Sequence, residues 1–265
     1  MKKKWVTFLR IPAFVLFLAG VGLLMYYGQK QRDQADCRNI DIRFSGAPQL
    51  TTSAEIYRLV RQRCDTLEGF LRISLPALES ALDTLPFIRK AEVFRTLNGT
   101  LVTTITERTP VARVFFSEGP SFYIDENLAL IPVREGFPID VPVVTGHLPR
   151  DAREAQRFLN ADSLKNITYL DEATGFLAYI RHDAFWQAQV EQVYITSEGE
   201  LELVPRVGNH VVLLGDTSHT AGKLAKLRMF YQEGLSRGGW NDFQYINLKF
   251  KNQVICKNTA HHGTQ

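Results

Sequence analysis

The stretch from Gly215 to Lys223 contains the residue types of a phosphate-binding loop. A P-loop needs four residues between its glycines and a Ser or Thr directly after the lysine, because backbone N–H groups surround the phosphates and the hydroxyl binds magnesium. Here six residues separate Gly215 from Gly222, and Leu224 follows Lys223. Both requirements fail, so the sequence does not predict a nucleotide site.

The other reactive side chains also lack the spacing of a metal site or of a catalytic nucleophile. The six histidines never form the H-E-x-x-H pattern of a zinc protease. No G-x-S-x-G segment supplies a serine nucleophile. Cys256 lies in an alternating apolar segment, where a packed thiol is the usual outcome. We therefore predict a protein without metal, cofactor or enzymatic activity.

The three cysteines cannot all pair within one chain. A bridge between Cys37 and Cys64 would close a loop of about 27 residues and contribute about 3 kcal/mol in an oxidising compartment. Two separate thiols fit the sequence equally well, so the sequence leaves this choice open.

The elements that must position any site begin with an uncharged apolar run at residues 11–28. Eighteen helical residues cover about 27 Å, close to the thickness of a bilayer's hydrocarbon core. A cleaved signal peptide is disfavoured because no Ala-x-Ala pattern follows the run. A buried core helix is disfavoured because the run is apolar on every face. We predict a retained transmembrane helix.

Charge around this run predicts its orientation. Lys2, Lys3, Lys4 and Arg10 precede it without an acidic residue, whereas charges of both signs follow it. The positive-inside rule therefore predicts a cytoplasmic tail at residues 1–10 and places the rest of the chain outside. Elsewhere Lys and Arg are scattered and the net charge is +3, which argues against a nucleic-acid partner.

Beyond a polar linker at residues 29–36, the patterns predict a small α+β unit. A strand at 39–45 is followed by a helix capped by Thr52 or Ser53, a connector at 65–73 and a helix capped by Ser74. Two strands joined by Asn98-Gly99 complete the unit. The order strand, helix, helix, strand, strand suits a sheet with both helices on one face.

The remaining residues read as short strands with two helices. We expect helices at 150–161 and 220–235, and strands at 190–196, 201–205 and 210–215. Residues 176–181 are ambiguous between helix and strand. Segments 243–250 and 253–257 form a last hairpin, and residues 258–265 are a polar tail that we expect to be disordered.

The last hairpin is the feature most suited to binding another protein. Ile246, Leu248 and Phe250 share one face, and Tyr245, Asn247 and Lys249 share the other. A terminal hairpin leaves a sheet edge with free N–H and C=O groups, which a strand from a partner can extend. An ordinary surface hairpin is the alternative.

Several segments resemble the FtsQ/DivIB family of bacterial division proteins. These are Leu85-Pro86-Phe87-Ile88, Ala91-Glu92-Val93, Leu101 and Glu107-Arg108-Thr109-Pro110-Val111-Ala112, which follow one another in register behind an N-terminal anchor. The resemblance implies a POTRA domain at 37–111 and a β-domain at 112–257, with an antiparallel sheet and backing helices. It also implies that the turn at 215–223 leads from a strand into a helix.

The resemblance further implies a scaffold in the inner (cytoplasmic) membrane at the division septum. Its partners would be FtsB/DivIC-like and FtsL-like proteins, bound at the final strands, with the POTRA domain as a second docking surface. The candidate contacts carried over are Lys249, Phe250, Asn252, Gln253 and Val254, with Arg228 on the preceding helix as a charge partner.

Two alternatives of other classes were weighed against the scaffold. A POTRA-type chaperone or docking factor for outer-membrane protein or polypeptide transport would need a C-terminal barrel, and about 150 residues after the POTRA domain are too few for most such barrels. A cell-wall enzyme would need a catalytic constellation, which the sequence lacks.

Overall fold

The computed structural model describes residues 17–23, 35–37, 39–63, 65–67, 70–96, 99–155, 168–234, 239–251 and 253–258. The chain divides into two compact units, Met1–Glu107 and Arg108–Gln265. Each unit is described by itself below.

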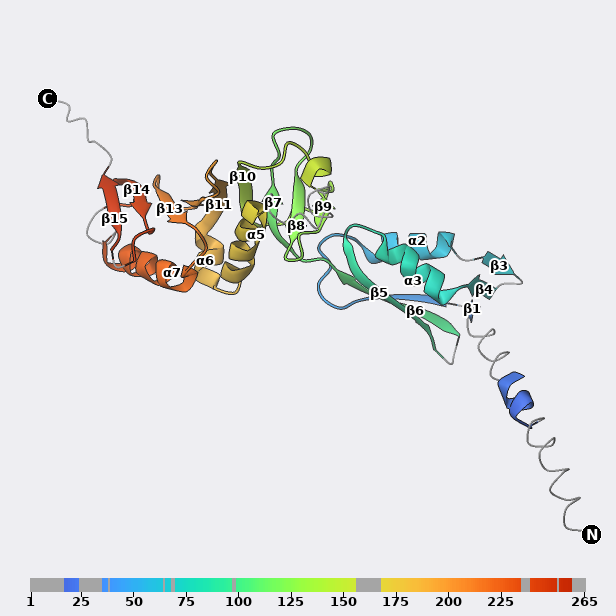
Figure 1. Cartoon of the computed structure of the whole chain (residues 1–265). Coiled ribbons are helices and arrows are strands. Elements are labelled where there is room, and N and C mark those ends of the chain that lie inside the picture. Colours follow the sequence, from blue (N-terminus) through green and yellow to red (C-terminus); the bar gives the residue numbers. More distant parts are fainter. Residues whose placement is uncertain are drawn as a thin grey trace, which may run out of the picture. The chain divides into compact units, whose positions relative to one another are not determined.

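The first unit contains a three-stranded sheet in the order β2 (Asn39–Phe44), β6 (Thr100–Glu107), β5 (Ile88–Arg95). β2 runs parallel to β6, and β5 runs antiparallel to it. Helices α2 (Ser53–Gln62) and α3 (Leu75–Asp83) lie together on one face of this sheet (Figure 1). The predicted strands and helices are present in the predicted order, with three further short strands among them.

Local signals explain where these helices begin. The Thr52 hydroxyl accepts a hydrogen bond from the backbone N–H of Glu55 at 3.2 Å, as an N-cap should. Ser74 is the N-cap residue of α3, as predicted, with an extended backbone, although its side chain makes no capping hydrogen bond. Pro76 in the first turn of α3 supplies a φ already suited to a helix.

Residues 65–73 form a hairpin rather than the connector we expected. β3 (Asp65–Leu67) and β4 (Phe70–Ile73) pair with each other, and β4 also pairs with β1 (Ala35–Cys37). Ala35 and Asp36 therefore belong to a strand and not to the linker. These strands are short and one partner is far away in sequence, so local periodicity could not reveal them.

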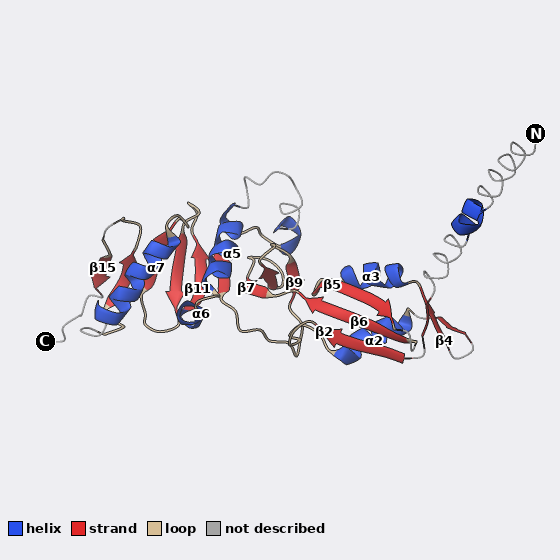
Figure 2. Ribbon diagram, turned by 90° about the horizontal axis from the view of Figure 1, so that it is seen from below, coloured by secondary structure: helices blue, strands red, loops and turns tan. Residues whose placement is uncertain are grey.

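The second unit is built on one nine-stranded sheet (Figures 1 and 2). From edge to edge its strands are β15 (Ile255–Asn258), β14 (Phe243–Asn247), β13 (Val211–Gly215), β12 (Leu201–Pro205), β11 (Val190–Ile195), β10 (Val143–Gly146), β7 (Pro110–Val114), β8 (Phe122–Asp125) and β9 (Leu130–Pro132).

This sheet is mixed, which corrects the expected antiparallel sheet. β10 runs parallel to β7 and β11, and β13 runs parallel to β14. Parallel neighbours need a long crossover connection, which helices usually supply. α5 (Thr168–Ile180) and α6 (Ala184–Gln189) lie between β10 and β11 in the chain, and α7 (Thr220–Met229) lies between β13 and β14.

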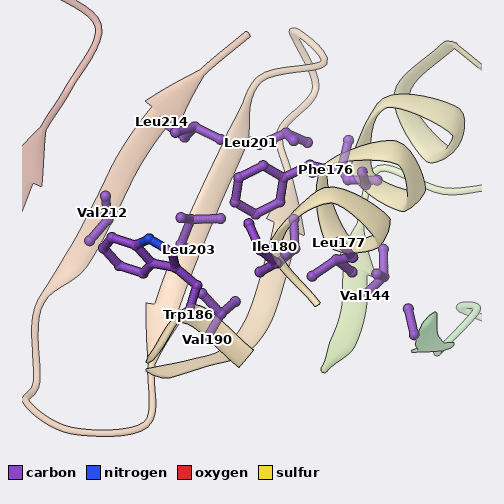
Figure 3. Close-up of a cluster of buried hydrophobic side chains, with 14 of the residues drawn as sticks. Val144, Phe176, Leu177, Ile180, Trp186, Val190, Leu201, Leu203, Val212 and Leu214 are labelled. Carbon is purple, nitrogen blue, oxygen red and sulfur yellow. The ribbon is translucent and has the colours of Figure 1, made fainter. Parts of the chain in front are cut away.

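The three helices cover one face of the sheet and enclose the main core (Figures 2 and 3). Phe176, Leu177 and Ile180 of α5 and Trp186 of α6 face Leu203 and its strand neighbours in this core. The segment 176–181, which the sequence left ambiguous, is the end of α5 and its last turn. A π-helical turn, η2 (Phe230–Gly234), continues α7.

The motif that begins at Glu107 has a structural role in both units. Glu107 accepts hydrogen bonds from the backbone N–H groups of Gln49 and Leu50 at 2.7 and 3.1 Å in the first unit. In the second unit the Arg108 guanidinium donates to the buried Asp125 carboxylate at 2.9 Å. Glu107 therefore holds the loop at Gln49 and Leu50 in the first unit, and Arg108 holds the end of β8 in the second unit.

Several predicted segments fall largely outside the described residues. Of the predicted transmembrane run 11–28, residues 17–23 are described and helical. No helix in the described ranges is both long and apolar enough to span a membrane. Of the predicted helix 150–161, residues 152–155 are helical, residues 150 and 151 precede the helix, and residues 156–161 are not described. Asn258 closes β15 rather than beginning the tail, and 259–265 are not described.

Candidate functional site: the C-terminal sheet edge

β15 forms one edge of the nine-stranded sheet. It pairs antiparallel with β14, and no other strand in the described part of the chain lies against it. Its outer side therefore presents backbone hydrogen-bonding groups without a ladder partner. The expected unpaired edge is present.

The direction of the backbone groups in β14 follows from one hydrogen bond. The N–H of Leu248 donates to the carbonyl of Leu213 at the end of β13, at 3.0 Å. Because successive residues of a strand direct their N–H and C=O groups to alternate sides, Tyr245 and Asn247 direct theirs towards β15.

Cys256 consequently presents its backbone to the outside. Tyr245 lies opposite Lys257 and Asn247 lies opposite Ile255, so these two residues of β15 form the hydrogen-bonded pairs. Cys256 lies between them, and its N–H and C=O point away from β14. This donor and acceptor form the part of the edge that an added strand would engage.

The side chains of β15 divide between the two faces of the sheet. Cys256 lies opposite the buried Ile246 and packs against the core, and burial raises the pKa of its thiol. Ile255 is 38% exposed and Lys257 is exposed, and both share the other face. The edge thus offers one apolar and one cationic side chain to a neighbouring strand.

The predicted contact residues near this edge have different surroundings. Phe250 is 44% exposed, whereas Ile246 and Leu248, expected to share its face, are fully buried. β14 ends at Asn247, so the alternation does not extend to Phe250. Gln253 is exposed and Val254 packs half-buried against the core. Asn252 lies outside the described residues.

Lys249 is engaged in a polar pocket at the end of β13 and β14. Its ammonium pairs with Glu200, and a Cβ at Gly215 would come 3.1 Å from its Cγ. The pocket encloses about 290 Å³ and is lined by Tyr169, Glu172, Glu198, Gly199, Glu200, Gly215, Asp216, Lys223 and Lys249. Burial raises the pKa of the Glu172 carboxyl, and the nearby Asp216 carboxylate raises it further.

Arg228 does not pair with the hairpin. Its Nη2 donates to both carboxylate oxygens of Asp183 at 2.8 and 2.6 Å, and its guanidinium lies 4.8 Å from the ring centroid of Phe185. Asp183 also caps α6 by accepting from the N–H of Phe185 at 3.0 Å. The Arg228 hydrogen bond holds the pKa of Asp183 below its usual value. Arg228 therefore joins α7 to α6.

Sequence reasoning missed Lys226, which holds the β14–β15 turn. Its ammonium donates to the backbone carbonyls of Phe250 at 2.7 Å and Lys251 at 3.3 Å. Nothing in the local pattern of α7 separates Lys226 from a solvated lysine, because both acceptors are backbone groups more than twenty residues away. Sequence reasoning also missed Cys256 as a residue of the free edge, although its place opposite Ile246 in the alternating hairpin could have indicated it.

In the stretch 215–223, which contains the residue types of a phosphate-binding loop, the lysine is bonded to another residue of the same stretch. Lys223 is largely buried, and its ammonium donates to the backbone carbonyl and to Oδ1 of Asp216 at 2.8 and 2.6 Å. This bond keeps the pKa of the Asp216 carboxyl below its usual value. Over the ranges that the structure describes, no three or more His, Cys, Asp or Glu side chains gather as metal ligands would.

Comparison with known proteins decides the family. A model described as "FtsQ/DivIB, C-terminal related" matches residues 109–257, and one described as "POTRA domain, FtsQ-type" matches residues 40–108. The chain belongs to the FtsQ/DivIB family. Its first unit is thus a POTRA domain and its second a β-rich domain with covering helices.

Curated relatives carry the name "Cell division protein FtsQ". The chain is 26% identical over 192 residues to the relative from Geotalea daltonii, covering 72% of this chain and 66% of that one. It is 28% identical over 186 residues to the relative from Rhodothermus marinus, covering 68% and 64%. The match thus spans slightly less than two thirds of these relatives.

Proposed function

We propose that this chain is a non-enzymatic scaffold of the division machinery that binds its partners by β-strand addition at β15. The partners would be the membrane-anchored FtsB/DivIC-like and FtsL-like proteins. The observation that carries the proposal is the free edge of β15, where Cys256 directs its N–H and C=O away from β14. Main-chain hydrogen bonds supply the affinity in such complexes, and alternate side chains supply the selectivity.

The side chains of the edge support a particular partner strand. Ile255 and Lys257 share one face, so an apolar and an acidic residue two positions apart in the added strand would lie beside them. Residues 11–28 would anchor the scaffold in the inner membrane with residues 1–10 in the cytoplasm. Anchoring raises the local concentration of partners in the same membrane, so each contact can be weak on its own.

The POTRA domain would serve as a second docking surface at the septum. The names of the curated relatives favour this role in division over the alternative in outer-membrane transport.

The test compares two substitutions at one position. The full chain carrying Cys256→Pro loses the outward N–H and leaves the β14 ladder bonds of Ile255 and Lys257 in place. Cys256→Ala removes the thiol and keeps the N–H. Binding of the FtsB/FtsL-type partner ectodomains from the same cell should weaken at least about tenfold for the first variant, while the second stays within about twofold.

Circular dichroism and tryptophan fluorescence would establish that both variants are folded. Equal affinity of folded Cys256→Pro and wild type would refute strand addition at β15. Loss of affinity in both variants would instead assign the effect to packing of the thiol.

A further inference from the structure

The outer edge of the POTRA sheet is formed by β5. It is the end strand in the order β2-β6-β5, and among the described residues it pairs only with β6. A strand in this position normally presents a row of free backbone donors and acceptors, which invites pairing with another chain. β5 has eight residues against the four of β15, so it offers the longer edge for such pairing.

One hydrogen bond shows which amides of β5 point outward. The N–H of Thr96, directly after the strand, donates to the carbonyl of Thr100 in β6 at 2.9 Å. Because successive residues of a strand direct their N–H and C=O groups to alternate sides, Phe94 also directs its groups towards β6. Ala91 and Val93 therefore direct theirs to the outer edge.

Two carboxylates of α3 occupy these outward donors. The N–H of Ala91 donates to Oδ1 of Asp83 at 2.7 Å, and the N–H of Val93 donates to Oε1 of Glu79 at 2.7 Å. Hydrogen bonds to an ionised acceptor are roughly twice as strong as those between neutral groups. Neither amide in the middle of the edge is thus available to an added strand.

The spacing of the two carboxylates matches the spacing of the two amides. Glu79 and Asp83 are four residues apart, so they lie on one side of α3 and about 6 Å apart along its axis. Ala91 and Val93 are two residues apart, which is about 6.7 Å along a strand. One carboxylate could meet an amide by chance, but two in register indicate a cover for this edge.

Without these carboxylates, the β5 edge would be complementary to itself. A two-fold axis beside Glu92 would bring Ala91 opposite Val93 of a second copy, and Val93 opposite Ala91 of that copy, with two pairs of main-chain hydrogen bonds. Lys90 would lie opposite the exposed Phe94 of the second copy, which is a favourable cation–aromatic contact. The chain itself is therefore the partner that an open β5 edge fits.

We propose that Glu79 and Asp83 keep the POTRA domain from pairing edge to edge with a second copy of the chain. Their carboxylates fill the donors that the second strand would need. The domain then stays monomeric, and its other surfaces remain available for docking. This inference goes beyond strand addition at β15 and does not depend on it, because it concerns the other compact unit of the chain.

The test opens the edge by substitution. The full chain carrying Glu79→Ala together with Asp83→Ala loses both acceptors, and alanine keeps the helical propensity of α3. Sedimentation velocity in detergent, over a range of protein concentrations, measures self-association. We expect this variant to dimerise with a Kd below about 100 μM, and the wild-type chain to associate at least about tenfold more weakly.

A second double variant controls for the change of charge. Asp41→Ala together with Glu92→Ala also removes two carboxylates from the POTRA domain. These two pair with Arg43 and Lys90, and neither accepts from an outward amide of β5. Its self-association should match that of the wild-type chain within about twofold, although removing Glu92 takes a like charge away from the two-fold axis.

Amide exchange tests the cover directly and needs no substitution. Recorded by NMR on the full chain at low concentration, the Ala91 and Val93 amides of wild type should exchange slowly despite their place at a sheet edge. In the variant without Glu79 and Asp83 they should exchange at least about tenfold faster while the chain is monomeric. At concentrations that favour the dimer they should become protected again.

A third substitution locates the new contact. Val93→Pro, added to the variant without Glu79 and Asp83, removes one outward donor, and proline is tolerated in an edge strand where the N–H faces outward. The chain should then return to the monomer. Circular dichroism would establish that each variant is folded.

Four results would overturn the inference. The first is rapid exchange of both amides in the wild-type chain. The second is a folded variant without Glu79 and Asp83 that stays monomeric although both amides exchange rapidly, which would leave the carboxylates only the role of fixing α3 to β5. The third is a dimer that survives Val93→Pro. The fourth is an equally strong dimer of the charge control.

Discussion

At the scale of single residues, Asp125 is the buried charge that organises the turn between β8 and β9. Its side chain is 2% exposed, and it accepts from the backbone N–H groups of Asn127 at 2.9 Å and Ala129 at 2.8 Å. Its other oxygen accepts from Arg108. Removing this carboxylate leaves three partly buried donors without their acceptor.

We therefore expect Asp125→Ala to lower the free energy of unfolding of the β-domain by on the order of 3 kcal/mol. Urea denaturation followed by tryptophan fluorescence measures it, because Trp186 and Trp240 both lie in this domain. The control is Asp140→Ala, whose exposed carboxylate pairs with Arg206 at 3.3 Å and should cost less than about 1 kcal/mol. Equal losses in the two variants would contradict this account.

His210 makes the stability of the β-domain depend on pH. The side chain is buried, and its Nε2 lies 2.9 Å from the Tyr231 hydroxyl. Burial lowers the pKa of His210 below its usual value of 6.5, and a backbone hydrogen bond with Trp240 opposes this shift. The folded state therefore binds a proton less readily than the unfolded state.

The sign of the effect follows from this difference. The stability that neutral His210 contributes is present above about pH 6.5 and is lost as the pH falls through the lowered folded pKa. We expect the free energy of unfolding of wild type to fall more steeply between pH 7.5 and 5 than that of His210→Leu. The exposed His147→Gln is the control, and its profile should match wild type. Parallel profiles for wild type and His210→Leu would rule out the assignment.

At the scale of elements, replacing glycine by alanine should have opposite effects on stability at two positions. Gly146 ends β10 with φ of 109°, and a Cβ there would lie 2.1 Å from the Ile195 carbonyl oxygen. Gly222 in α7 has open space around it. Gly146→Ala should therefore destabilise the domain by about 2 kcal/mol or more, and Gly222→Ala should stabilise it by about 0.5 kcal/mol. Thermal unfolding of both variants checks this, and a neutral Gly146→Ala would contradict the observed packing.

Lys226 links α7 to the proposed binding edge. Lys226→Met removes the donor to the Phe250 and Lys251 carbonyls, so the β14–β15 turn should loosen. We expect faster amide exchange in β15 and about fivefold weaker binding of the partner ectodomains, or about 1 kcal/mol, from the loss of these two exposed hydrogen bonds. Lys251→Met, which changes an exposed side chain next to the same turn, should leave both quantities unchanged. Unchanged amide exchange of β15 in Lys226→Met would show that Lys226 does not hold the β14–β15 turn.

The sequence predicted elements where periodicity or capping was local. Thr52, the leucine stripe of α3 and the alternation in β14 are local signals, and the corresponding elements are present. β1 was missed because its pairing with β4 joins residues far apart in the chain, and β3 and β4 were missed because they are too short to show a clear alternation. The parallel pairing of β10 with β11, and of β13 with β14, was missed because strand direction depends on the path of the connecting helices.

The free sheet edge was predicted from the sequence, whereas the partners of the side chains near it were not. The sheet edge follows from the position of the last hairpin in the chain. The partners of Arg228, Lys226 and Lys249 could not be predicted, because each is fixed by how α7 and the hairpin pack against other elements.

At the scale of the whole molecule, an FtsQ-type POTRA domain and a β-domain of the same family lie in one chain. The proposed docking surface of the POTRA domain and the proposed binding edge at β15 belong to different domains. A scaffold with separate surfaces can hold two segments of its partners at once, and their combined affinity exceeds that of either contact.

The measurement that tests the central claim most directly is residue-resolved amide exchange at β15, recorded by NMR on the full chain with and without the FtsB/FtsL-type partner ectodomains. The account predicts that the Cys256 amide, which points away from β14, exchanges quickly in the free chain and slowly in the complex. The Ile255 and Lys257 amides, already bonded to β14, should change little. A complex that forms while the Cys256 amide still exchanges quickly would contradict strand addition at this edge.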